Sequence, residues 1–353
     1  MTARFAIDEL QTFVAEALGR YGVDSKQART TAVRMLEADV RGQTAHGISR
    51  LPGYVKRLAS GGYNVAPNIH AVHETPVSAL IEGDNGLGHV VVSHAVDVAI
   101  DKAQQHGLAW VGTRGSNHAG AGGVYASLPL DHDMIGLYMA VGSANHVPPY
   151  GGVDLLLSTN PIAVAIPAGA EPPIVLDMAT TVASYGKIKA AAARGETIPE
   201  GWLTDRSGRP ITDPGRSGEG LLVPIGGYKG YGLGFVIGAL AGVLNGAAFG
   251  SEVVDMNADF RTPPNTGQTI IVMRPDLFGP VGEFKARMDA RIREIRTSTP
   301  MEGHAPVRLP GAGAAQRAAQ AHAQGVALEA SSVDRLTELA QRLRLHLPEP
   351  LAQ

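Results

Sequence analysis

His46 and Arg50 lie four residues apart in the segment RGQTAHGISR, residues 41–50. At that spacing on a helix both side chains face the same side, so they can serve one site. A guanidinium group binds a carboxylate through two parallel hydrogen bonds, and an imidazole exchanges protons near neutral pH. The pair suits a small acid that carries a hydroxyl or keto group. The alternative is a histidine at a helix end with an arginine on the solvent face.

A second histidine, His118, lies within the glycine-rich segment GSNHAGAGG, residues 115–123. A strand is predicted just before this segment, so its backbone amides are placed to bind a phosphate near the start of a helix. The segment matches neither the G-x-G-x-x-G fingerprint of dinucleotide-binding folds nor a P-loop. It is therefore either an unusual nucleotide-binding turn, with His118 as a second acid or base, or an ordinary glycine-rich turn.

Lys229 and Asp177 are two further candidates. Lys229 is flanked by glycines in GGYKGYG, residues 226–232, so its ammonium group can approach a ligand without obstruction. Asp177 ends a predicted strand in VLDMATT, residues 175–181, at the start of a predicted helix. Open α/β sheets bind ligands at such strand ends. The alternatives are a surface loop for the lysine and a helix N-cap for the aspartate.

The composition excludes several kinds of chemistry. The 353 residues include no cysteine, so disulfides, thiolate nucleophiles and cysteine metal sites cannot form. The segments HAVH (70–73) and DHD (131–133) stand alone, and the sequence has no H-E-x-x-H motif and no nucleophile elbow, so we expect no metal. A formal net charge of −3 without a Lys/Arg-rich run gives no reason to expect nucleic acid as a partner.

One uncharged stretch, residues 230–251, is long enough to span a bilayer. Glycine recurs there at every fourth position from Gly234 to Gly246, which favours a buried helix packed closely on a sheet, and no second hydrophobic segment accompanies it. We therefore expect no membrane association. The first residues lack the basic and apolar regions of a signal peptide, and together with the absence of cysteine this predicts a cytoplasmic location.

Helices and strands alternate along the chain. The spacing of apolar residues predicts helices at 8–20, 24–41, 46–60, 90–107, 180–195, 230–251, 281–296 and 331–343. It predicts strands at 77–83, 108–113, 134–141, 162–168, 173–179 and 269–275, and a turn-rich surface loop at 199–214. This alternation favours an α/β architecture, and the length of the chain predicts two lobes.

Several segments, in this order along nearly the whole chain, resemble the malate/L-lactate dehydrogenase family, which also includes sulfolactate and ureidoglycolate dehydrogenases and ketimine reductases. They are ADVRGQTAHGISRLPGYVKRL (38–58), GSNHAGAGG, STNPIAVAIP (158–167), VLDMATTVASYGKI (175–188), IPEGWLTDRSGRPITDP (198–214), GGYKGYGLG (226–234) and RLPG (308–311).

The resemblance implies an oxidoreductase that uses NAD or NADP to reduce small 2-oxo acids to 2-hydroxy acids of the malate or L-lactate type. It implies a homodimer and a mixed-sheet α/β fold that is not the Rossmann fold, which accounts for the missing fingerprint. The expected division is a helical lobe, an α/β substrate and dimerisation region, and a cofactor-binding domain. Their residues are 1–60 with 325–353, 61–115 with 297–324, and 116–296.

The resemblance also implies roles for individual residues. His46 corresponds to the proton donor and Arg50 to the ligand of the substrate carboxylate. His118 corresponds to a histidine with an acid/base role in some branches, and Thr159 and Lys187 are implied substrate contacts. The implied cofactor contacts are Ala119, Gly120, Ala121, Gly122, Gly123, Asp177, Met178, Ala179, Lys229, Arg308, Pro310 and Gly311.

The sequence departs from the family pattern at two positions. Ala45 replaces the usual serine, whose hydroxyl orients the histidine or relays a proton through it, so either a water replaces that hydroxyl or His118 takes over the proton transfer. RLPGAG, residues 308–313, lacks the glutamate that usually follows the first glycine. Lys187 after Gly186 matches the hydroxy-acid dehydrogenases, whereas ketimine reductases carry aspartate there. The alternatives are a cyclic ketimine or other 2-oxo acid reductase with the same pocket, and a cofactor-binding descendant without turnover.

Overall fold

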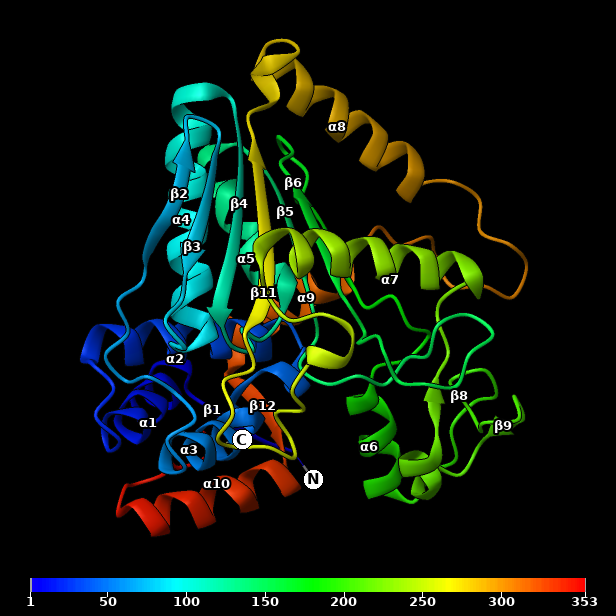
Figure 1. Ribbon diagram of the computed structural model, residues 1–353. Helices are drawn as coiled ribbons and strands as arrows, with labels where there is room; N and C mark the ends of the chain where they lie inside the picture. Colours follow the sequence, from blue (N-terminus) through cyan, green and yellow to red (C-terminus); the bar gives the residue numbers. More distant parts are fainter. Residues whose placement is uncertain (1, 353) are drawn as a thin grey trace.

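A seven-stranded mixed sheet forms the centre of the molecule in a computed structural model that describes residues 2–352 (Figure 1). Within it β3 and β4 run parallel, and all the other neighbouring strands run antiparallel. The strand order is β2 (His70–Thr75), β3 (Ser78–Glu82), β4 (Leu108–Ser116), β11 (Thr266–Met273), β5 (Ile135–Ala140), β6 (Ile162–Ile166) and β7 (Ile174–Met178).

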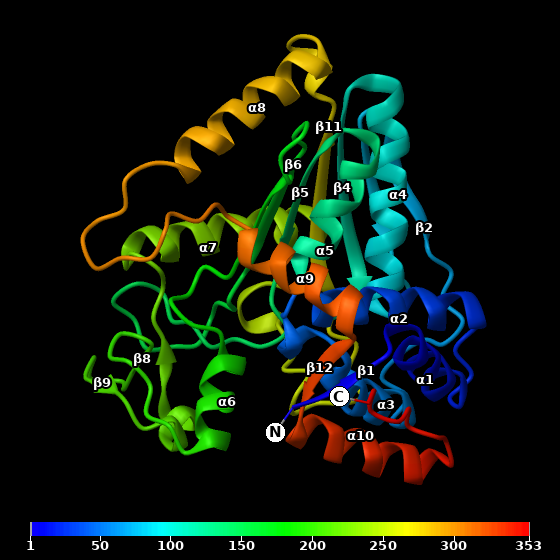
Figure 2. The same ribbon diagram turned by 180° about the vertical axis from the view of Figure 1, so that it is seen from behind.

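Helices cover both faces of this sheet. The helix α4 (Gly88–His106) provides the long crossover that parallel strands require, between β3 and β4. It buries alanines and valines against the sheet and ends at Gly107, whose φ of 86° favours glycine. The short helix α5 (Gly122–Ser127) lies on the same face (Figure 2). Helix α7 (Tyr228–Ala241) lies on the opposite face.

The glycine-rich stretch forms α7, and its glycines allow close packing, as expected. A Cβ atom on Gly238 would overlap the Phe249 ring, and one on Gly267 of β11 would overlap the carbonyl of Ala241. The prediction of a helix through residue 251 is wrong, because the helix ends at Ala241 and the chain turns at Gly242 (φ −99°, ψ −81°). Within residues 2–352 no helix is long and apolar enough to cross a membrane.

Both ends of the chain build one helical lobe. Its core contains apolar residues from near the amino terminus and others from after residue 320. The elements are β1 (Thr2–Phe5), α1 (Ile7–Gly19), α2 (Ser25–Val40), α3 (Leu51–Ala59), β12 (Val326–Glu329) and α10 (Ala330–Leu343), and β1 pairs antiparallel with β12. In Figures 1 and 2 this lobe lies below the central sheet.

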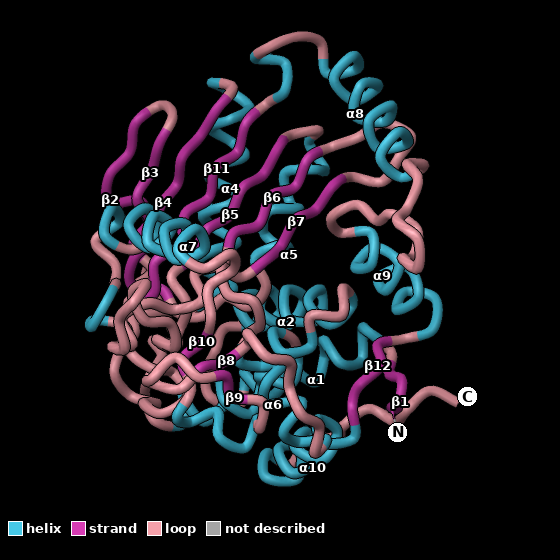
Figure 3. The backbone as a smooth tube through the Cα atoms, turned by 90° about the vertical axis from the view of Figure 1, so that its right-hand side faces the viewer, coloured by secondary structure: helices cyan, strands magenta, loops and turns pink. Residues whose placement is uncertain are grey.

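Of the remaining elements, α8 (Val281–Arg296) and α9 (Ala312–Gln324) lie beyond the edge strand β7 in Figure 3. In the same view, α6 (Tyr185–Arg194) and the short strands β8 (Leu203–Thr204), β9 (Pro210–Ile211) and β10 (Leu221–Leu222) lie below the sheet. The sequence patterns do not predict the strands β1, β2, β10 and β12 or the helices α5 and α9, and β8 and β9 fall within the surface loop predicted at 199–214. The strands β1, β12, β8 and β9 are too short to show a repeating pattern, and the side chains of β2 are mostly exposed.

Candidate active site

Two short 3₁₀ turns carry His46 and Arg50. They are η1 (Thr44–His46) and η2 (Ile48–Arg50), and between them Gly47 has φ −94° and ψ −148°, which breaks the helix. The prediction that a helix opens at this segment is therefore wrong, since α3 begins only at Leu51.

Asp39 of α2 fixes this break. Its Oδ2 accepts a hydrogen bond from the Ile48 amide at 2.6 Å, and a Cβ atom on Gly47 would overlap the same carboxyl group. Burial raises the pKa of Asp39 to about 7, although the hydrogen bond from Ile48 opposes that rise. A buried carboxyl group at the end of α2 therefore determines where His46 and Arg50 point.

The structure brings His46 and His118 together. Their rings stack with centroids 5.5 Å apart, and Nδ1 of His118 lies 2.6 Å from the Tyr54 hydroxyl. Burial, with the positive charge of Arg50 as the second cause, lowers the pKa of His46 to about 4. Burial, with the same arginine as the next cause, holds the pKa of His118 well below its usual value. Both imidazoles are therefore neutral at pH 7 in the absence of a bound anion.

Arg50 has no carboxylate partner among residues 2–352. Its Nε donates to the carbonyl of Ala45 at 2.9 Å, and its Nη1 donates to Oδ1 of Asn257 at 3.1 Å. These two neutral acceptors orient the guanidinium group without cancelling its charge. A partly exposed arginine in this arrangement suits a ligand carboxylate.

Asp177 at the end of β7 joins the glycine-rich turn to the histidine segment. Its Oδ2 accepts hydrogen bonds from Nε2 of Gln43 at 2.6 Å and from the amide of Gly123 at 2.7 Å. Burial raises the pKa of Asp177, and these two hydrogen bonds oppose the rise. Asp177 therefore fixes the turn formed by Ala119, Gly120, Ala121, Gly122 and Gly123 beside the segment that carries His46.

Further predicted residues gather around the end of β7. Met178 and Ala179 are partly buried there, and the next residue, Thr180, donates to the carbonyl of Thr159 at 2.9 Å. Thr180 also accepts from the amide of Ile225, four residues before Lys229. The glycine-rich start of α7 is thereby held next to this strand end.

The segment that contains Arg308, Pro310 and Gly311 runs along the same strand. The carbonyl of Pro310 accepts a hydrogen bond from the amide of Val175 at 3.4 Å, and a Cβ atom on Gly311 would lie 2.6 Å from the carbonyl oxygen of Val175. This contact lies two residues from Asp177.

Lys187 is exposed in the first turn of α6, which Ser184 caps through a hydrogen bond from the lysine amide to its hydroxyl. The neighbouring Gly186 packs on the histidine segment, since a Cβ atom placed on it would lie 3.1 Å from Cβ of Ala45. Lys187 therefore stands within the same region as His46.

Four residues of this cluster are not among the predicted site residues, namely Asp39, Tyr54, His89 and Asn257. A signal for Tyr54 was present, because it follows Arg50 by four residues, as Arg50 follows His46. His89 is 1% exposed, and its ring meets that of Tyr54 edge-on with centroids 5.5 Å apart. Asn257 comes from a loop about 200 residues later, which no local pattern connects to Arg50.

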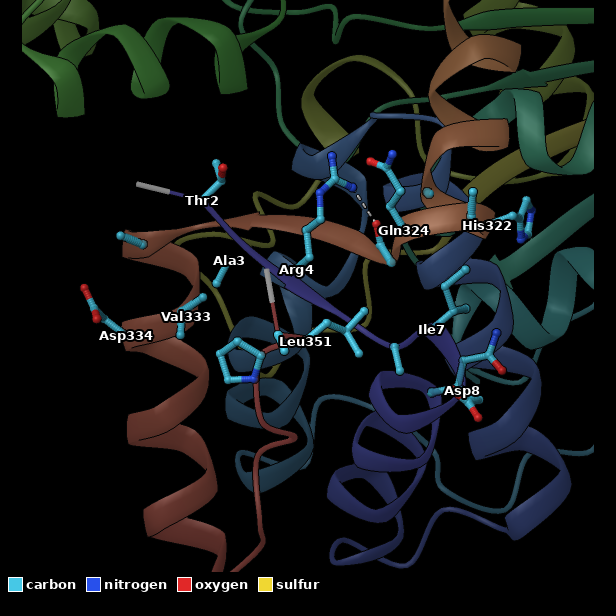
Figure 4. Close-up of a pocket in the computed structure, with 18 residues that line it drawn as sticks. Thr2, Ala3, Arg4, Ile7, Asp8, His322, Gln324, Val333, Asp334 and Leu351 are labelled. Carbon is cyan, nitrogen blue, oxygen red and sulfur yellow. Dashed lines mark hydrogen bonds between the residues drawn. The ribbon is translucent and has the colours of Figure 1, made fainter.

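A cavity of about 1390 Å³ lies elsewhere, between β1, the end of α9 and α10 (Figure 4). Its lining includes Arg4, His322 and Leu351 but none of the predicted site residues. The cluster around His46 is the stronger candidate for the active site, because two imidazoles lie there beside an arginine that has no carboxylate partner among residues 2–352. Within residues 2–352 no three His, Cys, Asp or Glu side chains are grouped as metal ligands.

The residues present fit a nicotinamide dinucleotide. Lys229 and Arg308 are exposed cations without an ion pair among residues 2–352, and a diphosphate requires such donors. The glycine turn has no room for larger side chains, since a Cβ atom on Gly123 would lie 2.8 Å from Oδ2 of Asp177.

Comparison with known proteins identifies the family of this chain. The sequence matches the malate/L-lactate dehydrogenase family over residues 5–337. It is 36% identical to the L-sulfolactate dehydrogenase of Methanocaldococcus jannaschii over 336 residues, which cover 95% of this chain and 96% of the relative.

Two solved structures extend the comparison. The malate dehydrogenase of Pyrococcus horikoshii superimposes with a TM-score of 0.90 at 32% identity, covering 99% of this chain and 97% of the other. The Δ1-piperideine-2-carboxylate reductase of Pseudomonas syringae gives a TM-score of 0.85 at 29% identity, covering 96% and 99%. These likenesses confirm the expected mixed-sheet α/β fold. The chain belongs to the malate/L-lactate dehydrogenase family and is a nicotinamide-dependent oxidoreductase of the hydroxy-acid dehydrogenase class.

Proposed function

We propose that this protein transfers a hydride between NAD or NADP and C2 of a small 2-oxo or 2-hydroxy acid of the malate or L-lactate type. Arg50 binds the substrate carboxylate, and His46 and His118 act as acid/base or hydrogen-bonding groups at the C2 oxygen. The observation that supports this most directly is the guanidinium group of Arg50, which has no anionic partner among residues 2–352 and lies beside the stacked rings of His46 and His118.

Binding of the carboxylate also changes the acidity of His46. The charge of Arg50 contributes to the low pKa of that imidazole, after burial. When a substrate carboxylate neutralises Arg50, this contribution is removed and the pKa of His46 rises. The histidine then takes up a proton together with the acid, and that proton is available to the oxygen at C2.

The carboxylate contact also orients the substrate. Holding C2 and its oxygen in one place converts an encounter between free molecules into a reaction within one complex. Thr159, whose carbonyl accepts hydrogen bonds from Thr180 just after β7, is proposed as a further substrate contact. Lys187 is proposed as another, because Gly186 beside it packs on the segment that carries His46.

The cofactor supplies the hydride when it is bound. Lys229 and Arg308 are proposed to bind its phosphates, because both are exposed cations, one in the first turn of α7 and one in the segment beside Val175 of β7. The other proposed contacts lie on the turn and strand that Asp177 connects, and on the segment beside Val175. They are Ala119, Gly120, Ala121, Gly122, Gly123, Met178, Ala179, Pro310 and Gly311.

Reduction of a cyclic imine is the second candidate, since one similar structure is a Δ1-piperideine-2-carboxylate reductase. Lys187 favours the C=O substrate, because the ketimine reductases of the family carry aspartate at the corresponding position. A third candidate is a cofactor-binding protein without turnover, which only the alanine at position 45 supports.

The test follows the absorbance of the reduced nicotinamide with NADH and NADPH separately. The substrates are pyruvate, oxaloacetate and a cyclic imino acid. Oxidation with a 2-oxo acid supports the proposal and identifies the preferred cofactor. Turnover with the imino acid alone would transfer the protein to the second candidate. Cofactor binding by fluorescence without turnover on any substrate would favour the third.

The proposal also includes the oligomeric state, the cellular location and the domain boundaries of the protein. A homodimer is supported by apolar side chains exposed along α7 and the turn after it, among them Phe235 at 48%, Val236 at 51% and Leu244 at 62%. Light scattering tests this: a monomeric mass would contradict it. The cytoplasmic location and the three-part division into domains remain predictions.

A further inference from the structure

The Tyr54 hydroxyl and His118 share a short hydrogen bond within this cluster. Oxygen and Nδ1 are 2.6 Å apart, and Tyr54 is 4% exposed on the buried face of α3. Either atom can be the donor in principle, depending on where the imidazole carries its proton. The direction matters, because it determines what His118 presents at its other ring nitrogen.

The surroundings of Tyr54 favour donation by the hydroxyl. Within residues 2–352 the hydroxyl has no hydrogen bond other than the one to His118. The ring of His89 meets that of Tyr54 edge-on, but neither of its buried ring nitrogens has a hydrogen-bond partner among residues 2–352, so His89 does not accept from the Tyr54 hydroxyl. If Nδ1 of His118 carried the proton, the buried O–H group of Tyr54 would be left without an acceptor, which is costly.

We propose that Tyr54 is a positioning residue whose hydroxyl donates to Nδ1 of His118 and so places the single proton of the neutral imidazole on Nε2. His118 then faces the substrate as a hydrogen-bond donor to the C2 oxygen, and proton exchange falls to His46. The inference rests on the proposed dehydrogenase function, since it assigns separate tasks to the two histidines of that site.

The two histidines differ in whether a neighbouring group fixes the position of the ring proton. Nδ1 of His46 is buried without a hydrogen-bond partner among residues 2–352, so no neighbour fixes the tautomer of that ring. In the reduction the C2 oxygen, which gains an electron pair as hydride reaches C2, forms an O–H bond as the N–H bond of protonated His46 breaks. Solvent returns a proton to His46. His118 polarises the C2 carbonyl throughout and keeps its own proton.

Tautomers can be read without activity, from the ¹⁵N shifts of the histidine ring nitrogens in protein labelled at histidine. The His118 signals are assigned by their loss in His118→Asn. We expect wild-type protein at pH 7 to show a protonated Nε2 and an unprotonated Nδ1 at His118. In Tyr54→Phe we expect a mixture of the two tautomers. A wild-type His118 protonated on Nδ1, or an unchanged ratio in Tyr54→Phe, would overturn the inference.

Tyr63 offers a matched control. It is buried, its ring packs edge-on against Tyr54 with centroids 6.4 Å apart, and its hydroxyl has no hydrogen-bond partner among residues 2–352. Tyr54→Phe should lower kcat for a 2-oxo acid about tenfold with little change in KM, the size of one neutral hydrogen bond. Tyr63→Phe should change neither. Equal kcat values in the two variants would contradict the role of Tyr54.

The two readouts separate failure of this inference from failure of the proposed function. If no 2-oxo acid is reduced but the tautomer of His118 responds to Tyr54→Phe, the function is wrong and the hydrogen-bond direction stands. If 2-oxo acids are reduced and the tautomer does not respond, the dehydrogenase stands and the positioning role of Tyr54 falls.

Discussion

Replacement of Arg50 by alanine removes the group proposed to bind the substrate carboxylate. A hydrogen bond to a charged group contributes about 1.5–3 kcal/mol, and a guanidinium group makes two to a carboxylate. Because Arg50 is partly exposed, solvent screening reduces the sum. We expect a loss of about 3 kcal/mol of transition-state stabilisation, which is roughly a 100-fold decrease in kcat/KM. Arg50→Lys keeps the positive charge without the planar guanidinium group, so its kcat/KM should lie between those of the wild type and Arg50→Ala.

The assay compares pyruvate with its methyl ester, which keeps the C2 carbonyl and lacks the negative charge. Wild-type protein should prefer the acid, and Arg50→Ala should lose most of that preference because the ester never used the contact. Arg209→Ala is the matched control, since Arg209 is an exposed arginine that pairs with Asp205 on a surface turn. The interpretation of Arg50 would be refuted if Arg50→Ala still preferred the acid by the wild-type factor.

The same variant tests the electrostatic coupling within the site. Arg50 lowers the pKa of His46, so its removal should raise that pKa from about 4, although burial still holds it below the usual value. For reduction, which needs protonated His46, the pH above which kcat/KM declines should therefore move upward in Arg50→Ala. A pH profile that does not move would show that the two side chains are not coupled.

Three further predictions concern stability and the cofactor. Asp39 has a pKa raised from 3.8 to about 7 in the folded state, so the wild type loses stability as the pH rises from about 4 to 7. Asp39→Asn cannot ionise, so its free energy of unfolding in urea should increase relative to wild type over that range, by at most about 4 kcal/mol. A difference between the two proteins that does not change with pH would contradict the raised pKa of the buried carboxyl group. Gly267→Ala should lower the free energy of unfolding by about 3 kcal/mol or more, because the new Cβ atom would overlap the backbone carbonyl of Ala241, and neither β11 nor α7 can shift freely. A variant as stable as the wild type would contradict that packing. Lys229→Ala should raise KM for the nicotinamide cofactor about tenfold with little effect on KM for the 2-oxo acid, measured by varying each in turn, and the reverse pattern would place the lysine at the substrate.

The sequence alone determined the chemical inventory and most of the periodic elements. The apolar stripes of α1, α2 and α10 and the apolar runs of β4, β5 and β6 are local patterns, and each element formed where its pattern predicted it. The absence of cysteine likewise follows from composition alone. A histidine and an arginine four residues apart already indicated a small acid with a hydroxyl or keto group as the ligand.

Tertiary structure decided how those residues are used. The helix is interrupted at Gly47, between His46 and Arg50, because the buried carboxyl group of Asp39 occupies the space that a side chain at position 47 would need. No local sequence pattern reveals this contact. One of the two neutral acceptors that orient Arg50 comes from Asn257, far along the chain. The stacking of His46 on His118, and the bond that Tyr54 makes to His118, likewise require residues from separate elements to meet. Side-chain type sets what chemistry is available, whereas pKa, tautomer and free charge depend on neighbours that only the folded chain supplies.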